Sequence, residues 1–183
     1  MKARLGTLFL AGFLLVLPAC RADGQTVRTY GYKVEEVLPH DAGSYTQGLF
    51  FEDGVLYESA GQYGTSSFRK VELKTGRVDR RLNFDRRYFA EGACVLNGRL
   101  YVLTWQEHEC FVHDFNSWER LGSFRYAGEG WGLTTDGKQL IMSDGTSEIT
   151  FRDPCAAGRI AMQITYTNMP VILMWDRLPA GLL

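Results

Sequence analysis

The sequence predicts an all-β protein that is built as a β-propeller. Its 183 residues include 20 Gly, 11 Phe, 9 Tyr and 4 Trp, a combination that favours short strands joined by tight turns. No window sustains helical periodicity over ~12 residues, the length that an ordinary helix needs. A unit of about forty residues recurs along the chain, and this is the size of a four-stranded propeller blade.

The charge balance excludes one class of partner. The chain has 20 Lys+Arg against 21 Asp+Glu, which gives a net charge of −1. Such a protein has no excess of basic residues for a phosphate backbone, so we expect no nucleic-acid partner. The apolar content of 45% is enough for a packed core, and the length indicates one domain.

Residues 1–19 have the pattern of an export signal. A basic start precedes the apolar run Leu8–Leu17, which is too short to span a bilayer as a helix. Residues 17–20 resemble a bacterial lipoprotein box in which Cys20 would be lipidated, although Pro18 is unusual there. Plain cleavage and membrane anchoring through a lipidated Cys20 both stay open. We expect an exported protein, either periplasmic or secreted.

Beyond Cys20, three cysteines follow the signal: Cys94, Cys110 and Cys155. An odd number in an exported chain allows at most one disulfide. A Cys94–Cys110 pair and three half-buried thiols are both open. In either case stability must come mainly from packing.

Three segments share one pattern, in which a glycine opens an apolar strand, a turn follows and a second strand begins. Each turn is Asp-Gly or Asn-Gly, the strongest short-range indication of a hairpin. The segments are Gln47–Tyr57, Glu91–Tyr101 and Trp131–Ile141.

Each unit continues with a third and a fourth strand, and a further strand is expected around Thr29–Leu38. A β-sandwich with coincidental spacing is the alternative fold, but it does not explain why every unit opens with the same X-Gly-apolar step. The third strands are expected at Phe68–Leu73, Cys110–Phe115 and Glu148–Arg152, and the fourth at Val78–Phe84, Leu121–Tyr126 and Arg159–Thr165.

The residue before the first glycine holds an equivalent place in every unit. These residues are Gln47, Glu91 and Trp131. Because the innermost strands of a propeller line its channel, we expect these three side chains at one mouth, where ligands bind.

Large aromatic side chains are predicted around the same mouth. Tyr45 and Phe89 lie two residues before Gln47 and Glu91, on the same face of a strand. Trp105 ends a second strand, where the neighbouring units have glycine. A carboxylate among aromatic rings loses solvation, so its pKa rises and it can carry a proton near neutral pH. For Glu91 a solvated loop position, and for the aromatic rings a place in the core between blades, are the open alternatives.

Four motifs resemble the plant and bacterial type of glutaminyl-peptide cyclotransferase, and the resemblance runs from about Tyr32 to Pro154. It implies a five-bladed propeller that converts the N-terminal glutamine of peptides or proteins to pyroglutamate and releases ammonia, without catalytic zinc or another cofactor. The motifs are His40–Leu49, Arg87–Gly92, Leu103–Glu107 and Gly128–Gly137.

The resemblance also implies roles for single residues. Glu91 matches the acid/base that takes a proton from the attacking amine and returns one to the departing amide nitrogen. Pocket tryptophans are matched by Trp105 and Trp131, and the substrate-holding wall by Gln47 with Tyr45 and Phe89.

The resemblance stops near Pro154, because residues 155–183 show neither the later motifs of the family nor another blade. We therefore expect a partial propeller over residues 20–154, with about three blades in an incomplete ring, and then a divergent tail. Such a C-terminally truncated form is expected to have little or no activity. A non-catalytic, secreted propeller that binds a peptide or a sugar is the alternative.

The segment Glu107–Cys110, with His113, offers mixed metal-ligand types. Strand alternation divides these side chains between two faces, and no second cluster completes a site. We expect an ordinary outer loop here and no bound metal.

Overall fold

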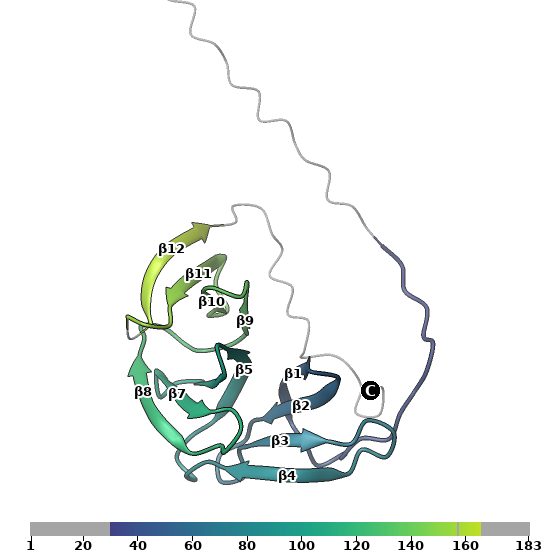
Figure 1. Ribbon diagram of the computed structural model, residues 1–183. Coiled ribbons are helices and arrows are strands. Elements are labelled where there is room, and N and C mark those ends of the chain that lie inside the picture. The colour runs from purple at the N-terminus through teal and green to yellow at the C-terminus, as the bar shows by residue number, and fades with distance from the viewer. Residues whose placement is uncertain (1–29, 157, 166–183) are drawn as a thin grey trace, which may run out of the picture. The chain divides into compact units, whose positions relative to one another are not determined.

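The computed structural model describes residues 30–156 and 158–165, and all regular structure in them is β (Figure 1). Within these residues, twelve strands form three antiparallel sheets of four, each in chain order. The all-β prediction and the expected blades are confirmed. The first sheet contains β1 (Thr46–Glu52), β2 (Val55–Ala60), β3 (Ser67–Val71) and β4 (Val78–Asn83), the second β5 (Ala90–Leu96), β6 (Arg99–Thr104), β7 (Glu109–Asp114) and β8 (Arg120–Arg125), and the third β9 (Leu133–Thr135), β10 (Leu140–Ser143), β11 (Glu148–Asp153) and β12 (Arg159–Thr165).

The hairpins between first and second strands follow the predicted turns in two of the three sheets. Asp53-Gly54 and Asn97-Gly98 have positive φ at both residues, as a type I′ turn requires. The third turn differs, because Leu140 pairs with Thr135 and leaves residues 136–139 as a longer loop. The side chain of Asp136 accepts hydrogen bonds from backbone N–H groups inside this loop.

Contacts divide the chain into two units, Met1–Val34 and Glu35–Leu183. In the first unit the described residues, Tyr30–Val34, have no regular structure. The strand predicted around Thr29–Leu38 is wrong over Tyr30–Leu38. Each described sheet takes its four strands from one repeat unit, so this segment pairs with no sheet edge among the described residues.

The export signal predicted at residues 1–19, together with Cys20, lies outside the described residues. Of the predicted tail, the described part ends at Thr165 and includes β12, which is the fourth strand expected at Arg159–Thr165. None of the residues that the structure describes forms a helix that could cross a membrane.

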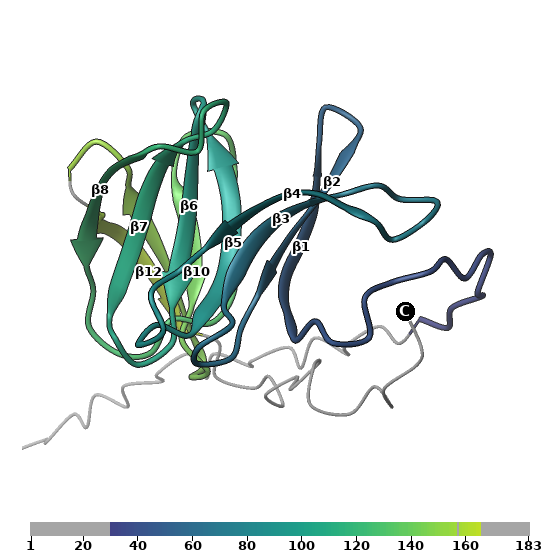
Figure 2. The same cartoon turned by 90° about the horizontal axis from the view of Figure 1, so that it is seen from below.

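In the second unit the three sheets meet at their first strands. Strand β5 contacts β1 on one side and β9 on the other, while β4, β8 and β12 lie outermost (Figures 1 and 2). Over the described residues the sheets form an open array and do not close a ring. The core fills the two spaces between neighbouring sheets. Buried side chains of the first space include Phe68, Ala93, Leu100, Val102 and Trp118, and those of the second Tyr101, Leu103, Phe124, Leu140 and Met142.

The cysteines of the described residues are free thiols. Cys94 and Cys110 are buried between the second and third sheets, and Cys155 is exposed. Burial raises the pKa of Cys94 to about 12, so this thiol packs as a small apolar side chain. Of the two open alternatives, the structure has the unpaired thiols.

Gly92 allows the second and third sheets to approach closely. Its N–H donates to the Trp131 carbonyl at 2.8 Å. A Cβ at position 92 would lie 2.5 Å from the Leu133 nitrogen and 2.6 Å from the Trp131 oxygen. Both are backbone atoms, so a larger residue must push the two strands apart.

We expect Gly92→Ala to lower the free energy of unfolding by about 1–3 kcal/mol, because overpacking against backbone cannot be relieved by a rotamer change. Gly122→Ala is the matched control, since a Cβ there meets nothing within 4 Å. Denaturant unfolding followed by near-UV circular dichroism measures both. Equal midpoints for the two variants would contradict the close approach at Gly92.

Candidate active site

Two of the predicted site residues lie in β-bulges at the start of inner strands. In β1 the register shifts between Thr46 and Gly48, which places Gln47 in the bulge. In β5 it shifts between Ala90 and Ala93, around Glu91. Bulges re-aim side chains and are common beside active sites. The equivalence of Gln47 and Glu91 inferred from the repeat therefore has a structural basis, although simple strand alternation does not describe it.

Glu91 is a buried acid, with 9% of its surface exposed. Its side-chain Oε1 accepts a hydrogen bond from Gln47 Nε2 at 3.1 Å, and its backbone oxygen accepts one from Ser59 Oγ at 2.5 Å. Loss of solvation, together with the smaller effects of the negative charges of Glu129 and Glu107, raises the pKa of Glu91 to about 8. Near neutral pH this group can both release and accept a proton.

Glu129 is a functional candidate that the sequence did not reveal. The indole N–H groups of Trp105 and Trp131 both donate to its Oε2, at 2.7 and 2.9 Å. These hydrogen bonds, from Trp131 first and then from Trp105, hold the pKa of Glu129 below its usual range. One ionised carboxylate therefore joins the two tryptophans predicted to form the pocket.

Glu107 also belongs to this region, so the outer-loop interpretation is wrong for this residue. The hydroxyl of Tyr63 donates to its Oε1 at 2.9 Å, and the Phe89 backbone N–H donates to its Oε2 at 3.3 Å. The pKa of Tyr63 is raised, mainly by burial and to a smaller extent by the hydrogen bond to Glu107. This tyrosine was not singled out in the sequence.

The other side chains of the mixed cluster have other partners. His108 Nδ1 makes a hydrogen bond with the Gly128 carbonyl, and Glu109 binds Arg120. His113 is buried against the carbonyl of Trp118. Within the described residues no group of three or more His, Cys, Asp or Glu side chains lies close enough to hold a metal ion.

Aromatic rings form a continuous wall beside Glu91. Phe89 contacts Tyr45, Tyr63 and Trp105 edge to face, with ring centroids 6.1, 5.4 and 5.6 Å apart. Edge-to-face packing is the preferred geometry of such rings. The indole ring of Trp131 packs against Gly145, between β10 and β11 of the third sheet, where a Cβ would lie 2.7 Å from the ring. A side chain there would displace this tryptophan.

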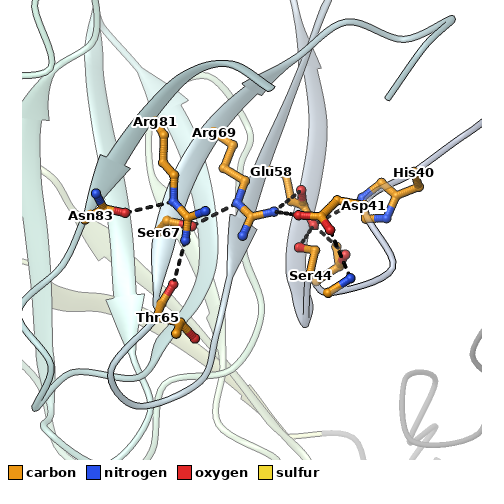
Figure 3. A network of polar contacts seen from close by, with 11 residues as sticks. His40, Asp41, Ser44, Glu58, Thr65, Ser67, Arg69, Arg81 and Asn83 are labelled. Atoms are coloured by element: carbon orange, nitrogen blue, oxygen red, sulfur yellow. Dashed lines mark hydrogen bonds and ion pairs between the residues drawn. The ribbon is translucent and has the colours of Figure 1, made fainter. Parts of the chain in front are cut away.

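A polar network fixes the segment that leads into β1. Glu58 on β2 is buried and accepts a hydrogen bond from the Ser44 hydroxyl (Figure 3). Arg69 on β3 donates to Asp41 at 2.9 Å and lies 3.9 Å from Glu58 (Figure 3). The chain entering the bulge at Gln47 is therefore tied to the first sheet by buried charged groups.

Two surface grooves lie away from this region. One, of about 410 Å³, includes Tyr57, Arg80 and Trp118 in its lining, and the other, of about 430 Å³, follows the hairpin turns near Asp53 and Asn97. Neither is lined by a predicted site residue. The candidate site at Glu91 is instead defined by the side-chain geometry at the starts of the inner strands.

The structure brings all six predicted residues together. Gln47 contacts Glu91, Phe89 lies between Tyr45 and Trp105, and Trp105 shares a partner with Trp131. The missed residues are Glu107, Glu129 and Tyr63. The first two lie within the motifs Leu103–Glu107 and Gly128–Gly137, so their place in those motifs was the available indication.

Repeated four-stranded sheets with one buried acid at the starts of the inner strands define a β-propeller protein with a candidate acid/base site walled by aromatic rings. The glutamine cyclotransferase family matches the chain over residues 8–171. The chain belongs to this family, and the resemblance seen in its motifs is confirmed.

Known proteins agree with this assignment. The chain is 42% identical, over 119 residues, to a glutaminyl-peptide cyclotransferase of Arabidopsis thaliana; the match covers 64% of the chain and 37% of the relative. A glutaminyl cyclase structure from Myxococcus xanthus superimposes with a TM-score of 0.64 at 31% identity, over 70% of this chain and 53% of that one. The chain thus spans a little over a third of the length of the first relative and about half of the second.

A more distant structure supports the fold alone. The WD40 domain of Pan2 from Neurospora crassa matches with a TM-score of 0.52 at 13% identity, over 66% of this chain and 36% of that one. WD40 domains are propellers, so this likeness agrees with the blade assignment.

We expect the raised pKa of Glu91 to appear as pH-dependent stability. The folded protein holds a proton on Glu91 up to about pH 8, whereas the unfolded chain releases it near the ordinary value of 4.5. As pH rises from about 4.5 to about 8, the wild type should therefore lose free energy of unfolding relative to the Glu91→Gln variant. The loss should be ~1.4 kcal/mol per unit of difference between the folded and unfolded pKa values. Above pH 8 the difference should stay constant.

Urea unfolding between pH 4 and pH 9 measures this difference. The exposed Glu119, changed to Gln, serves as the control and should follow the wild-type pH dependence. If the wild type and the Glu91 variant lose stability in parallel, Glu91 titrates as an ordinary surface acid.

Proposed function

We propose that this chain carries the acid/base site of a glutaminyl-peptide cyclotransferase. The reaction converts the N-terminal glutamine of a peptide or protein to pyroglutamate and releases ammonia. The observation that carries the proposal is Glu91, a buried acid beside Gln47 whose pKa of about 8 lies close to that of a peptide α-amine. Family membership supports the same assignment.

Glu91 transfers one proton twice in this reaction. The α-amine nitrogen attacks the γ-carboxamide carbon, the new C–N bond forms, and the carboxylate of Glu91 takes a proton from that nitrogen. The protonated Glu91 then gives the proton to the amide nitrogen as its bond to carbon breaks, and ammonia leaves. Gln47 engages Oε1 of Glu91, which leaves Oε2 as the oxygen that meets the substrate.

The reaction is an acyl transfer within one molecule, because the γ-glutamyl acyl group moves from one nitrogen to another. In this proposal the tryptophans and Phe89 hold the folded glutamine side chain and keep water away. Well-oriented intramolecular reactions reach effective molarities of about 10⁵–10⁸ M, so positioning supplies much of the acceleration. Acid/base help from one carboxylate adds about 10²–10⁴-fold.

Export is part of the proposal. The basic start and short apolar run at residues 1–19 support delivery to the periplasm or the outside of the cell. Cys20 is the residue that would carry a lipid if the protein is anchored.

We expect Glu91→Gln to reduce kcat/KM for a Gln-initiated peptide by about 10²–10⁴-fold, because the amide cannot carry the proton. Ammonia release, corrected for the uncatalysed cyclisation, measures the rate. Glu119→Gln removes one exposed charge and should leave the rate unchanged. A peptide with an acetylated N-terminus is the substrate control.

Equal turnover by the wild type and the Glu91 variant would remove Glu91 from its role. Binding of the Gln peptide without any ammonia release would instead favour the non-catalytic binding module. Loss of release in the Glu119 variant as well would point to damage to the fold.

A further inference from the structure

We propose that Glu129 is a positioning residue that holds both pocket tryptophans through one carboxylate and places a negative charge beside Glu91. The catalytic consequence rests on the proposed function, but the two structural effects do not. Three observations carry the inference: the hydrogen bonds of Glu129, the anchoring of its loop, and the set of charges around Glu91.

The hydrogen bonds of Glu129 converge from two parts of the chain. Trp105 and Gln106 follow the end of β6, and their side chains donate to Oε2 and Oε1 at 2.7 and 3.2 Å. Trp131 precedes β9 and donates to Oε2 at 2.9 Å. One oxygen thus sets the positions of both indoles, and the carboxylate links the second sheet to the third.

The loop that carries Glu129 is anchored on both sides. His108 Nδ1 lies 2.6 Å from the Gly128 carbonyl oxygen. Beyond Glu129, the Gly130 N–H donates to the Trp105 carbonyl at 3.0 Å, and the Trp131 N–H donates to the Ser143 carbonyl at 3.1 Å. A loop held this firmly delivers the carboxylate to one place, as a positioning role requires.

The charge on Glu129 is kept by the same contacts. Indole N–H donors favour the ionised form, and His108 adds to this effect. Among the described residues, the groups that bear on Glu91 include the carboxylates of Glu129 and Glu107, the phenol of Tyr63 and the neutral amide of Gln47. Burial is the largest cause of the raised pKa of Glu91, and of the two carboxylates Glu129 has the larger effect.

Two substitutions separate the hydrogen bonds from the charge. Glu129→Gln keeps an oxygen acceptor for the indoles and removes the charge, whereas Glu129→Ala removes both. Glu119→Gln is the matched control, because it removes one charge from an exposed turn. All three are compared with the full wild-type chain.

The first measurement is the ¹H–¹⁵N spectrum of the indole groups, assigned with Trp105→Phe and Trp131→Phe. We expect both indole resonances to keep slow solvent exchange in Glu129→Gln and to lose it in Glu129→Ala. The indole of Trp118 packs under Arg80 between the first two sheets and should not move in any variant. Unchanged exchange in Glu129→Ala would overturn the positioning role.

The second measurement is the titration of the Glu91 carboxyl carbon in protein labelled with ¹³C-glutamate. We expect Glu129→Gln to move the Glu91 midpoint to lower pH by ~1 unit, the effect of removing one nearby like charge. Glu119→Gln should leave the midpoint in place. An unchanged midpoint in Glu129→Gln would overturn the electrostatic half of the proposal.

Kinetics then distinguish this inference from the proposed function. With a Gln-initiated peptide, the part of the pH dependence of kcat/KM that reports Glu91 is the limb that is lost in Glu91→Gln. In Glu129→Gln we expect this limb to shift to lower pH by the same amount as the Glu91 titration. Neither spectroscopic measurement needs turnover. Absence of ammonia release from the wild type would defeat the proposed function, while a failed spectroscopic result would defeat only the role of Glu129.

Discussion

The structure depends on the short bulged step at Glu91-Gly92, where the three sheets meet. The Glu91 carbonyl accepts a hydrogen bond from Ser59 of the first sheet, and the Gly92 N–H donates to Trp131 just before the third. A side chain at position 92 would collide with backbone on that side. The residue that carries the candidate chemistry is therefore held by the contacts that hold the blades together, and its geometry cannot change without disturbing the fold.

This constraint explains why an unfavourable arrangement of charges persists. Glu91, Glu107 and Glu129 lie near one another, and burial makes the ionised form of Glu91 costly. Each of the other two acids has its own donors, from Tyr63 and the Phe89 backbone or from the indoles and Gln106. Of the three carboxyl groups, Glu91 has the surroundings that stabilise the ionised form least. The proton is therefore held on Glu91.

Much of this could be predicted from residues alone, and the exceptions have physical reasons. The repeat of glycine, apolar strand and turn located the blades, and equivalence between units located Gln47, Glu91 and Trp131. Strand periodicity does not reveal bulges, so the way Glu91 is aimed needed the structure. Glu129 and Glu107 lie in loops, where no periodicity marks which side chain turns inward. The segment before β1 alternates like a strand, but over its described residues it pairs with none of the three sheets.

The cluster of three acids also bears on how the site exchanges its contents. A peptide with a free N-terminus arrives as a cation near neutral pH, and carboxylates attract it. Pyroglutamate has no basic nitrogen, so the proposed reaction discharges the group that the acids attract. The product then has no electrostatic reason to stay. A peptide with a blocked N-terminus likewise lacks the positive charge that these carboxylates attract, so the field of the site favours the substrate over both the blocked peptide and the cyclised product.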